Sequence, residues 1–376
     1  MDHDLSALTR ELVPQVLAQT RSLVDISTPS GELEATERAV GLCAGYLPGW
    51  RVQRLPCSTT ACAADMLATV EGNGRRRLLL LGHLDTVVAH SQHRPAREQG
   101  ERLYGSGTAD MKGGVAVLLA VARACEELRE HYAELAVLLV CDEEWRVAPF
   151  AHTARFAGFD ACLCFEAGEV NEQGEDGVIV RRKGAGTLRV AAAGRASHSG
   201  SAPHHGRNAL LALAHAAIRA AAVADDHGGA QLTVVPTIVR SGDAINVVPP
   251  SGELVIDMRA SDTDVFAHVV AALPDEVGGA TLHPVLERVW PAMDSEATAA
   301  PLLAAASGLL GRPIVPRARG GASDASHFAP MIPLTVDGLG PRGGGAHTPD
   351  EFVHLPSLGE RLAVAMAVAR AAILQI

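Results

Sequence analysis

Residues 78–85 read LLLLGHLD, a run of four leucines that ends in a histidine and an aspartate. A short apolar run bounded by turn residues is typical of a buried strand. Further apolar runs lie at 135–141 (LAVLLVC), 161–165 (ACLCF) and 332–336, and 114–130 has a helical pattern. Apolar strands that alternate with helices predict an α/β domain, built on a mostly parallel sheet that helices cover on both faces.

The pattern changes near residue 178. Strand-like patterns occupy 178–190 and 231–239, and helical patterns follow at 206–224 and 263–273. In 253–259, apolar residues alternate with polar ones, which is the period of a half-exposed strand. An α+β segment of about 180–290 is therefore expected to interrupt the α/β domain, which resumes near residue 295.

Composition excludes several classes of protein. Hydrophobic residues make up 48% of the 376 residues, which is enough for a large core and excludes a disordered chain. No apolar run approaches the roughly 18 residues that span a bilayer, and the N-terminal MDHDLSALTR lacks the pattern of a secretory signal. A net charge of −11 without a basic stripe argues against nucleic-acid binding. We expect no membrane and no nucleic-acid partner.

Cysteine usage favours the cytoplasm. The cysteines are seven in number, form no CxxC pair and lie mostly in apolar segments: Cys43, Cys57, Cys62, Cys125, Cys141, Cys162 and Cys164. This pattern indicates reduced, mostly buried thiols. The alternative is a disulfide such as Cys57–Cys62.

Acids and histidines follow the predicted strands. His83 and Asp85 come after the first strand, 142–144 (DEE) after the second, and Glu166 after the third. In open α/β sheets, sites form at the carboxyl ends of strands, so these side chains are candidate metal ligands.

Each candidate alone also has an ordinary structural explanation. His83 fits a buried structural histidine, and Glu143 and Glu144 fit a solvent-facing pair. Asp110 precedes a helix and fits an N-cap. His347 lies in a glycine-rich loop, 338–349, and would complete a ligand set from a distant part of the chain.

Taken together, the motifs resemble one family, the co-catalytic di-zinc peptidases and deacylases, which include aminoacylase, acetylornithine deacetylase, succinyl-diaminopimelate desuccinylase and glutamate carboxypeptidase. The catalytic motifs are HLD at 83–85, GTADMKGG at 107–114, DEE at 142–144, FE at 165–166 and GGGAHTPDEF at 343–352. The inserted segment matches through RKG at 182–184, GRASHSG at 194–200, GRNA at 206–209, AINVVP at 244–249 and DMR at 257–259. The sequence looks most similar to the glutamate carboxypeptidase branch.

The resemblance implies a site with two zinc ions, for which Co²⁺ or Mn²⁺ are possible substitutes. Asp110 would bridge the two ions. His83 and Glu166 would complete one, and Glu144 and His347 the other.

The resemblance also implies the other roles. Asp85 would orient His83, and Glu143 would be the general base. His198 would reach into the partner subunit's active site and stabilise the oxyanion. Arg259, with Asn246, would meet the carboxylate or carbonyl of the substrate. Residues 1–179 and 293–376 would be the catalytic domain, and 180–292 the lid and dimerisation domain of a homodimer.

The chemistry of these residues agrees with that assignment. Three ligand carboxylates and Glu143 would place four negative charges in one pocket, and two zinc ions compensate them. Oxygen and imidazole ligands without thiolate suit a hydrolytic site. Two metals roughly 3.5–4 Å apart can hold a bridging hydroxide near neutral pH and polarise a carbonyl. Glu143 would take the proton of the water and deliver it to the leaving amine.

The expected activity is hydrolysis of an amide or peptide bond beside a free carboxylate, on a small peptide or an N-acyl amino acid. A glutamate carboxypeptidase is the first hypothesis, and an N-acyl-amino-acid deacylase similar to acetylornithine deacetylase is the second. Many relatives have a Gly-Ser segment where this chain has Trp145 and Arg146, a difference that bears on the substrate pocket. A catalytically inactive binding protein would have lost the base or a ligand.

Other enzyme classes lack their motifs here. A nucleotide-dependent oxidoreductase needs GxGxxG, and this chain has an aspartate, Asp110, in place of the third glycine. GxSxG and HExxH do not occur.

Overall fold

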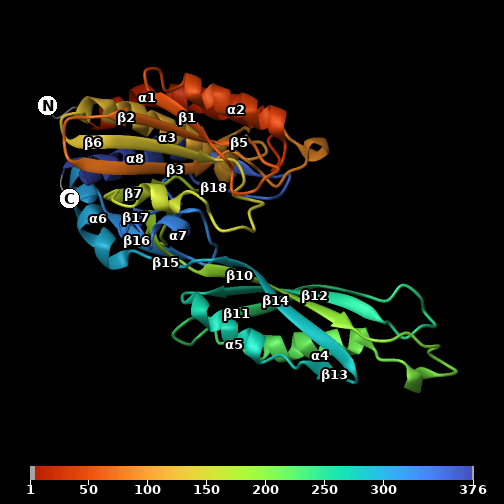
Figure 1. The fold of residues 1–376 in the computed structure, drawn as a ribbon. Helices are drawn as coiled ribbons and strands as arrows, with labels where there is room; N and C mark the ends of the chain where they lie inside the picture. The colour runs from red at the N-terminus through yellow and green to blue at the C-terminus, as the bar shows by residue number, and fades with distance from the viewer. Residues whose placement is uncertain (1–4, 375–376) are drawn as a thin grey trace. The chain divides into compact units, whose positions relative to one another are not determined.

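The computed structural model describes residues 5–374, which form two compact units (Figure 1). The first comprises the described residues of Met1–Arg181, Asp294–Ala318 and Ser323–Ile376. The second comprises Arg182–Met293 and Arg319–Ala322.

A six-stranded sheet forms the centre of the first unit. Its order is β1 (Arg51–Leu55), β2 (Asp65–Glu71), β6 (Tyr132–Val140), β3 (Arg76–His83), β7 (Ala161–Cys164) and β17 (Thr335–Val336). The pairs β3–β6, β3–β7 and β7–β17 are parallel, which confirms the predicted α/β sheet. The pairs β1–β2 and β2–β6 are antiparallel and add an edge that the sequence did not predict.

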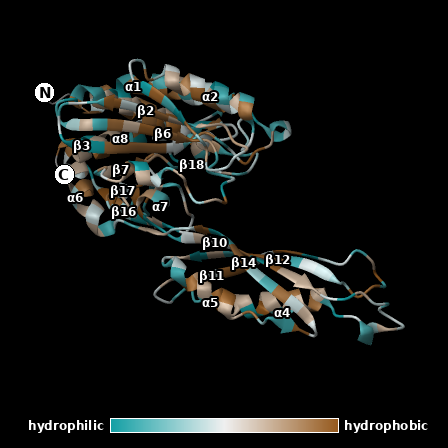
Figure 2. Cartoon of the chain, viewed as in Figure 1, coloured by the Kyte–Doolittle hydropathy of each residue, from teal (hydrophilic) through white to brown (hydrophobic). Residues whose placement is uncertain are grey.

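Buried leucines explain why β3 lies at the centre. Leu78 to Leu81 are fully buried, and Figure 2 shows β3 and β6 as largely hydrophobic strands. The helix α3 (Gly113–Cys125) is apolar on all sides, as expected of a helix that is buried all round. It packs against β3, α1 (Leu5–Val24) and α8 (Leu355–Leu374).

Further elements complete this unit. The other helices are α2 (Leu33–Gly45), α6 (Glu296–Leu310), α7 (Ala325–Phe328) and the short η1 (His90–Gln92), η2 (Thr108–Lys112), η3 (Glu126–Leu128) and η4 (Thr153–Phe156). A small sheet joins β4 (Arg97–Gln99), β5 (Arg102–Tyr104), β19 (Phe352–His354) and β18 (Gly343–Gly344). The remaining strands are β8 (Glu169–Val170), β9 (Asp176–Arg182), β15 (Met293–Asp294) and β16 (Ile314–Arg319), and β9, β15 and β16 each cross the unit boundary by one residue.

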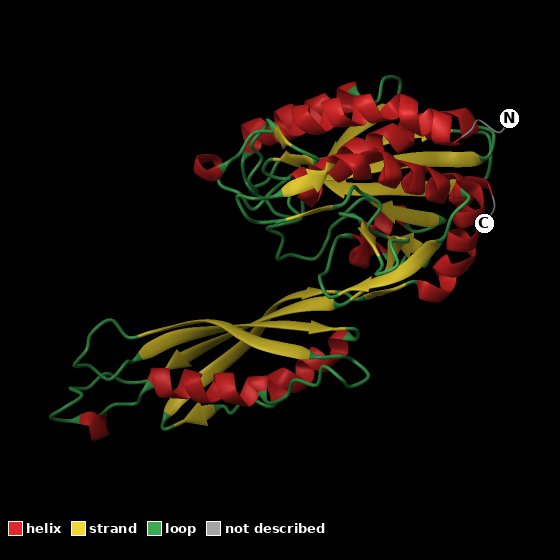
Figure 3. Cartoon of the chain, turned by 180° about the vertical axis from the view of Figure 1, so that it is seen from behind, coloured by secondary structure: helices red, strands yellow, loops and turns green. Residues whose placement is uncertain are grey.

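The second unit is an antiparallel sheet with helices against one face (Figure 3). The strand order is β11 (Thr233–Ser241), β12 (Ser251–Ala260), β10 (Gly184–Ala193), β14 (Ala280–Trp290) and β13 (Glu276–Val277). The helices are α4 (Ala209–Ala221), α5 (Phe266–Ala271) and the short η5 (Pro203–His205) and η6 (Thr263–Val265). The predicted alternation in β12 is confirmed, because Leu254, Ile256 and Met258 are buried in the core that contains α4 residues.

Two predictions about the whole chain can be compared with residues 5–374. All seven cysteines are free thiols, so the alternative disulfide between Cys57 and Cys62 is not formed. Among the described residues, no helix combines the length and hydropathy needed to cross a bilayer.

Candidate functional site

The carboxyl ends of three adjacent strands bring the predicted acids and histidines together. β3 pairs in parallel with β6 on one side and β7 on the other, so all three strands end at the same edge. His83 is the last residue of β3, Glu143 and Glu144 follow β6, and Glu166 follows β7. This edge of a parallel sheet is where open α/β folds place their sites.

Asp110 lies between two imidazoles. Its Oδ1 is 3.1 Å from Nε2 of His83, and its Oδ2 is 3.0 Å from Nε2 of His347. Glu166 Oε1 lies 3.6 Å from the same nitrogen of His83, and Glu144 Oε1 lies 3.2 Å from that of His347. The five predicted ligands therefore form two half-sites that share Asp110.

His347 reaches this edge from a loop that two strand pairs hold. β18 and β19 pair at the ends of the loop, and β19 also pairs with β5. His347 itself has a φ of 64°, in the left-handed region that few non-glycine residues adopt. The position of the His347 ring therefore depends on tertiary contacts, which the local sequence pattern does not predict.

Asp85 holds both His83 and the acidic loop. The Nδ1 of His83 lies 3.1 Å from the Asp85 carbonyl oxygen and 3.4 Å from its Oδ1. The Asp85 carboxylate accepts hydrogen bonds from the backbone N–H groups of Glu143 and Glu144, each at 3.1 Å, and from the Ser30 hydroxyl at 2.7 Å. Partners of this kind fix the orientation of ligands. Ser30 was not predicted, because nothing in its local sequence links it to Asp85.

Glu351 is a second residue that sequence reasoning missed. It is only 2% exposed, and its carboxylate accepts the backbone N–H groups of Gly107 (2.7 Å), Ala109 (2.8 Å) and Asp110 (2.9 Å). These bonds hold the segment that presents Asp110. The sequence feature that could have pointed to Glu351 is the GGGAHTPDEF motif, which contains this residue but does not reveal its role.

The N-cap explanation of Asp110 does not hold. The helix α3 begins at Gly113, and its N-cap position is Lys112, without a side-chain cap. The Asp110 carboxylate faces His83 and His347 instead.

Several carboxyl groups lie close together in this site, and nearby positive charge is needed to keep all of them ionised. Burial raises the pKa of Glu143 to about 7; the Glu144 and Asp110 carboxylates add to this rise, and His83 opposes it. Burial and the Asp110 carboxylate raise the pKa of Glu166 well above its usual range. Burial also acts on Asp110, but its hydrogen bonds with His347 and His83 outweigh burial and lower its pKa.

The donor set fits a divalent metal. One ligand atom each of His83, Asp110 and Glu144 lies within 4.8 Å of the other two. Carboxylate and imidazole donors without sulfur match the ligands of hydrolytic zinc, cobalt and manganese sites. Cations between these side chains would stabilise the ionised form of the four acids.

His198 and Asn246 lie in the second unit and belong to neighbouring loops. The Nδ1 of His198 accepts the backbone N–H groups of Gly200 and Ser201, each at 3.1 Å, so the proton of the neutral ring resides on Nε2. The backbone oxygen of Asn246 accepts the N–H of Ser199 at 3.0 Å. Both predicted residues are exposed.

Arg259 is not brought together with Asn246. Its Nε and one terminal nitrogen each donate to the Asp257 carboxylate at 3.0 Å. Asn246 precedes the start of β12 and Arg259 lies near its end, and the stretch from Ser251 to Arg259 extends roughly 26 Å at 3.3 Å per residue.

Trp145 and Arg146 differ sharply in exposure. Arg146 is fully buried, with one nitrogen 2.9 Å from Asp142 Oδ1, another bonded to Asp324, and its guanidinium over the Phe150 ring. It therefore braces the acidic loop and does not face a substrate pocket. Trp145 is 55% exposed beside Glu144, so of the two only the indole is available to a substrate.

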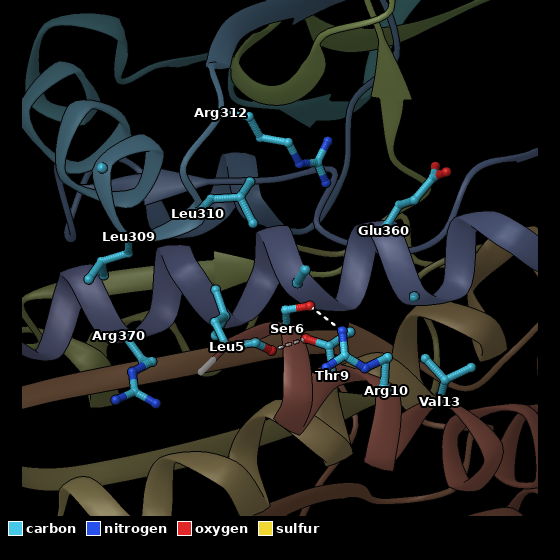
Figure 4. A pocket seen from close by; sticks show the side chains of 13 residues that line it. Leu5, Ser6, Thr9, Arg10, Val13, Leu309, Leu310, Arg312, Glu360 and Arg370 are labelled. Atoms are coloured by element: carbon cyan, nitrogen blue, oxygen red, sulfur yellow. Dashed lines mark hydrogen bonds between the residues drawn. The ribbon is translucent and has the colours of Figure 1, made fainter. Parts of the chain in front are cut away.

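A cavity of about 640 Å³ lies elsewhere in the first unit, lined by residues of α1, α6 and α8 (Figure 4). None of the predicted site residues lines it. Its cations have partners within the chain, since Arg10 donates to Ser6, Arg312 pairs with Asp176, and Arg370 pairs with Glu127.

The fold and the ligand cluster define a metal-dependent hydrolase. Peptidase family M20/M25/M40 matches residues 79–371, and the chain belongs to this family. Its members are metal-dependent enzymes that hydrolyse amide and peptide bonds, and the same holds for this chain.

Individual relatives differ in their named activities. Carboxypeptidase G2 of Pseudomonas sp. (strain RS-16) is 27% identical over 376 residues, which cover 94% of this chain and 88% of the relative. Acetylornithine deacetylase of Edwardsiella ictaluri is 32% identical over 270 residues, covering 66% of this chain and 68% of its own. A family M20 metallo-carboxypeptidase from Sulfolobus solfataricus shares the fold, with a TM-score of 0.75 at 15% identity over 96% of this chain and 99% of its own.

Proposed function

We propose that this protein is a di-zinc hydrolase that cleaves an amide or peptide bond beside a free carboxylate. The observation that carries this proposal is Asp110, whose two oxygens face His83 and His347 separately. His83, Asp110 and Glu166 would hold one ion, and Asp110, Glu144 and His347 would hold the other. Bound zinc supplies Lewis acidity toward water and toward the scissile carbonyl, and Co²⁺ or Mn²⁺ can replace it.

Glu143 is the general base of this proposal. Its pKa of about 7 suits a group that takes a proton from water and returns it to the leaving amine near neutral pH. Asp85 bonds to both the Glu143 backbone and the His83 ring, so it fixes the position of the base relative to that ligand.

A glutamate-type carboxypeptidase is the first substrate class. The similarity to carboxypeptidase G2 extends over 94% of this chain, including the second unit. Arg259 would bind the substrate carboxylate through its remaining terminal nitrogen, since Asp257 holds the other edge of the guanidinium.

An N-acyl-amino-acid deacylase is the alternative. It is favoured by the higher identity, 32%, to acetylornithine deacetylase over a shorter region. The exposed Trp145 beside Glu144 would narrow the side-chain preference in either class.

The second unit serves in this proposal as lid and dimerisation domain, 180–292, beside a catalytic domain of 1–179 and 293–376. β11 is an edge strand that exposes Val235, Ile238 and Val239, and the neighbouring α4 exposes Leu211 and Ile218. An exposed apolar edge of this kind is a ready site for pairing with a second copy.

In such a homodimer, His198 and Asn246 would act in the partner subunit's site. The Nε2–H of His198 is a donor suited to an oxyanion. The seven free thiols support a reducing compartment, the cytoplasm.

The test is hydrolysis of a panel of substrates by the purified full chain, before and after chelation, with metal content measured on the same samples. The panel contains peptidyl-glutamates, N-acyl-glutamates and acetylornithine. Two metals per chain with chelator-sensitive release of glutamate support the first class, and release only from acetylornithine supports the deacylase. A chain without metal, or with activity indifferent to the chelator, contradicts the proposal.

A further inference from the structure

A second group of candidate ligands lies where the end of β6 meets the end of β1 and the start of β2. Cys57 follows β1, Asp65 begins β2 and Asp142 follows β6 (Figure 1). Because β2 pairs antiparallel with both β1 and β6, these ends lie at the same place in the sheet. The Cys57 sulfur and one carboxylate oxygen each of Asp65 and Asp142 lie within 4.8 Å of one another.

Asp65 supplies an independent sign of a missing partner. The residue is fully buried, and its Oδ1 accepts the backbone N–H of Cys141 at 2.9 Å. Its Oδ2 has no hydrogen-bond partner among residues 5–374. The Nε2 of His152 is 3.5 Å from this oxygen, an ion-pair distance if the ring is protonated, but its hydrogen bond goes to the Pro56 carbonyl oxygen at 2.8 Å. A buried carboxylate oxygen without a partner is costly, and a bound cation would satisfy it.

The charges around this group are not balanced. Asp65, Asp142 and Asp324 are buried. The fully buried Arg146 bonds to Asp142 and Asp324, and His152 lies at ion-pair distance from Asp65. Arg54, the other nearby guanidinium, is engaged by Glu37 on the surface. Even with His152 protonated, one negative charge therefore remains before the Cys57 thiol is counted.

We propose that Cys57, Asp65 and Asp142 bind a divalent metal ion of the zinc type, at a site separate from the pair that shares Asp110. A sulfur ligand selects zinc-like ions over magnesium and calcium, and zinc accepts thiolate and carboxylate together at 2.0–2.3 Å. Binding releases the Cys57 proton to solvent, with no change in oxidation state. The Cys62 thiol interacts with that of Cys57 but lies outside the group of ligand atoms within 4.8 Å of one another, so Cys57 is the sulfur ligand of the proposed site.

This ion would act on the acidic loop. Asp142 directly precedes Glu143 and Glu144, and Arg146 anchors the far end of the same turn. A metal at Asp142 would tie this turn to the β1–β2 connection, through Cys57 and Asp65. Its role is therefore structural, and it does not depend on the identity of the substrate.

Cobalt substitution tests the site, because the ligands around Asp110 include no sulfur. The purified full chain is stripped of metal, kept reduced with a phosphine and titrated with Co²⁺. We expect a sulfur-to-cobalt charge-transfer band in the near ultraviolet. The band should disappear in Cys57→Ser, and it should remain in Asp110→Asn, which removes the shared ligand of the other pair. Cys125→Ser is the matched control, since Cys125 is a buried thiol of α3 outside the group, and it should keep the band.

Asp65→Asn provides a second variant that keeps the size of the side chain, and circular dichroism checks that each variant is folded. We expect Asp65→Asn to bind the thiolate-reporting Co²⁺ at least about tenfold more weakly. A wild-type chain without the band at saturating Co²⁺ would overturn the proposal. This holds whether a thiol assay finds all seven cysteines reduced or finds two of them in a disulfide. A band that survives in folded Cys57→Ser would also overturn it. Loss of the catalytic pair leaves this band unchanged, so failure of the proposed function is a separate result.

Discussion

At the scale of single residues, Asp110 and Glu143 divide the chemistry of the site. Asp110 presents one oxygen to each imidazole, and its hydrogen bonds with them lower its pKa and favour the ionised carboxylate. Burial raises the pKa of Glu143 to about 7, and the charge of His83 only partly opposes this rise. Two carboxylates in one pocket thus receive opposite pKa shifts, which is the arrangement expected of a ligand and a base.

Replacing the base should separate chemistry from metal binding. Glu143→Gln keeps the shape of the side chain and removes the group that accepts the proton. We expect kcat to fall by about 10²–10⁴ while the metal content per chain stays unchanged. Glu172→Gln, on an exposed turn, is the control and should retain wild-type kcat. A near-normal kcat in Glu143→Gln would remove the residue from the role of base.

The pKa of Glu143 also sets a direction for the pH profile. A general base acts only when ionised, so kcat/KM should fall as pH drops through the pKa of Glu143. Bound cations favour the carboxylate, so this acid limb should lie at or below about pH 7. The measurement is kcat/KM from about pH 5 to 8, with metal content checked at each pH. A flat profile with full metal content would contradict the assignment.

At the scale of elements, the segment Thr108–Lys112 depends on a distant carboxylate. Glu351 accepts the backbone N–H groups of Ala109 and Asp110 in this segment, and that of Gly107 just before it, so the position of Asp110 is fixed from the other end of the sequence. Glu351→Gln removes the negative charge that accepts these backbone hydrogen bonds. We expect metal affinity to fall by about 10–100-fold, as for other residues that hold a ligand in place.

Metal titration followed by calorimetry measures the effect of Glu351→Gln. Glu360→Gln is the control, because Glu360 lies on the exposed side of α8 and pairs with Arg342. Equal metal affinities in the two variants would show that the Glu351 carboxylate does not position Asp110.

The same elements show what sequence can and cannot predict. The strands β3, β6 and β7 were predictable because each is a continuous apolar run, and their ends located His83, the acidic pair and Glu166. β1 was missed because its residues are mostly exposed, and β17 is shorter than 332–336 because only Thr335 and Val336 pair with β7. Ser30 and Glu351 act through contacts far apart in sequence, which no local pattern contains.

At the scale of the whole molecule, the metals should contribute to folding stability. Their proposed ligands come from β3, the segment before α3, the ends of β6 and β7, and the loop before β19, so binding ties together distant parts of the first unit. Ligands that bind only the folded state raise stability by mass action. Chelation should lower Tm, and added Zn²⁺ should restore it. Calorimetry that shows the same Tm with and without chelator would argue against bound metal.

The last prediction concerns whether the site is complete within one chain. His198 and Asn246 share neighbouring loops beyond one end of β12, whereas Arg259 lies toward the other end. If His198 serves the partner subunit, His198→Ala and Glu143→Gln should each be nearly inactive alone, yet should complement each other when mixed. In a mixed dimer, the site of the His198→Ala chain keeps its own base and receives His198 from the partner. Random exchange between two equal populations should then restore about a quarter of wild-type activity. Activity that stays at the level of the separate variants, after light scattering has confirmed a dimer and mass spectrometry has confirmed exchange, would place His198 outside the partner's site.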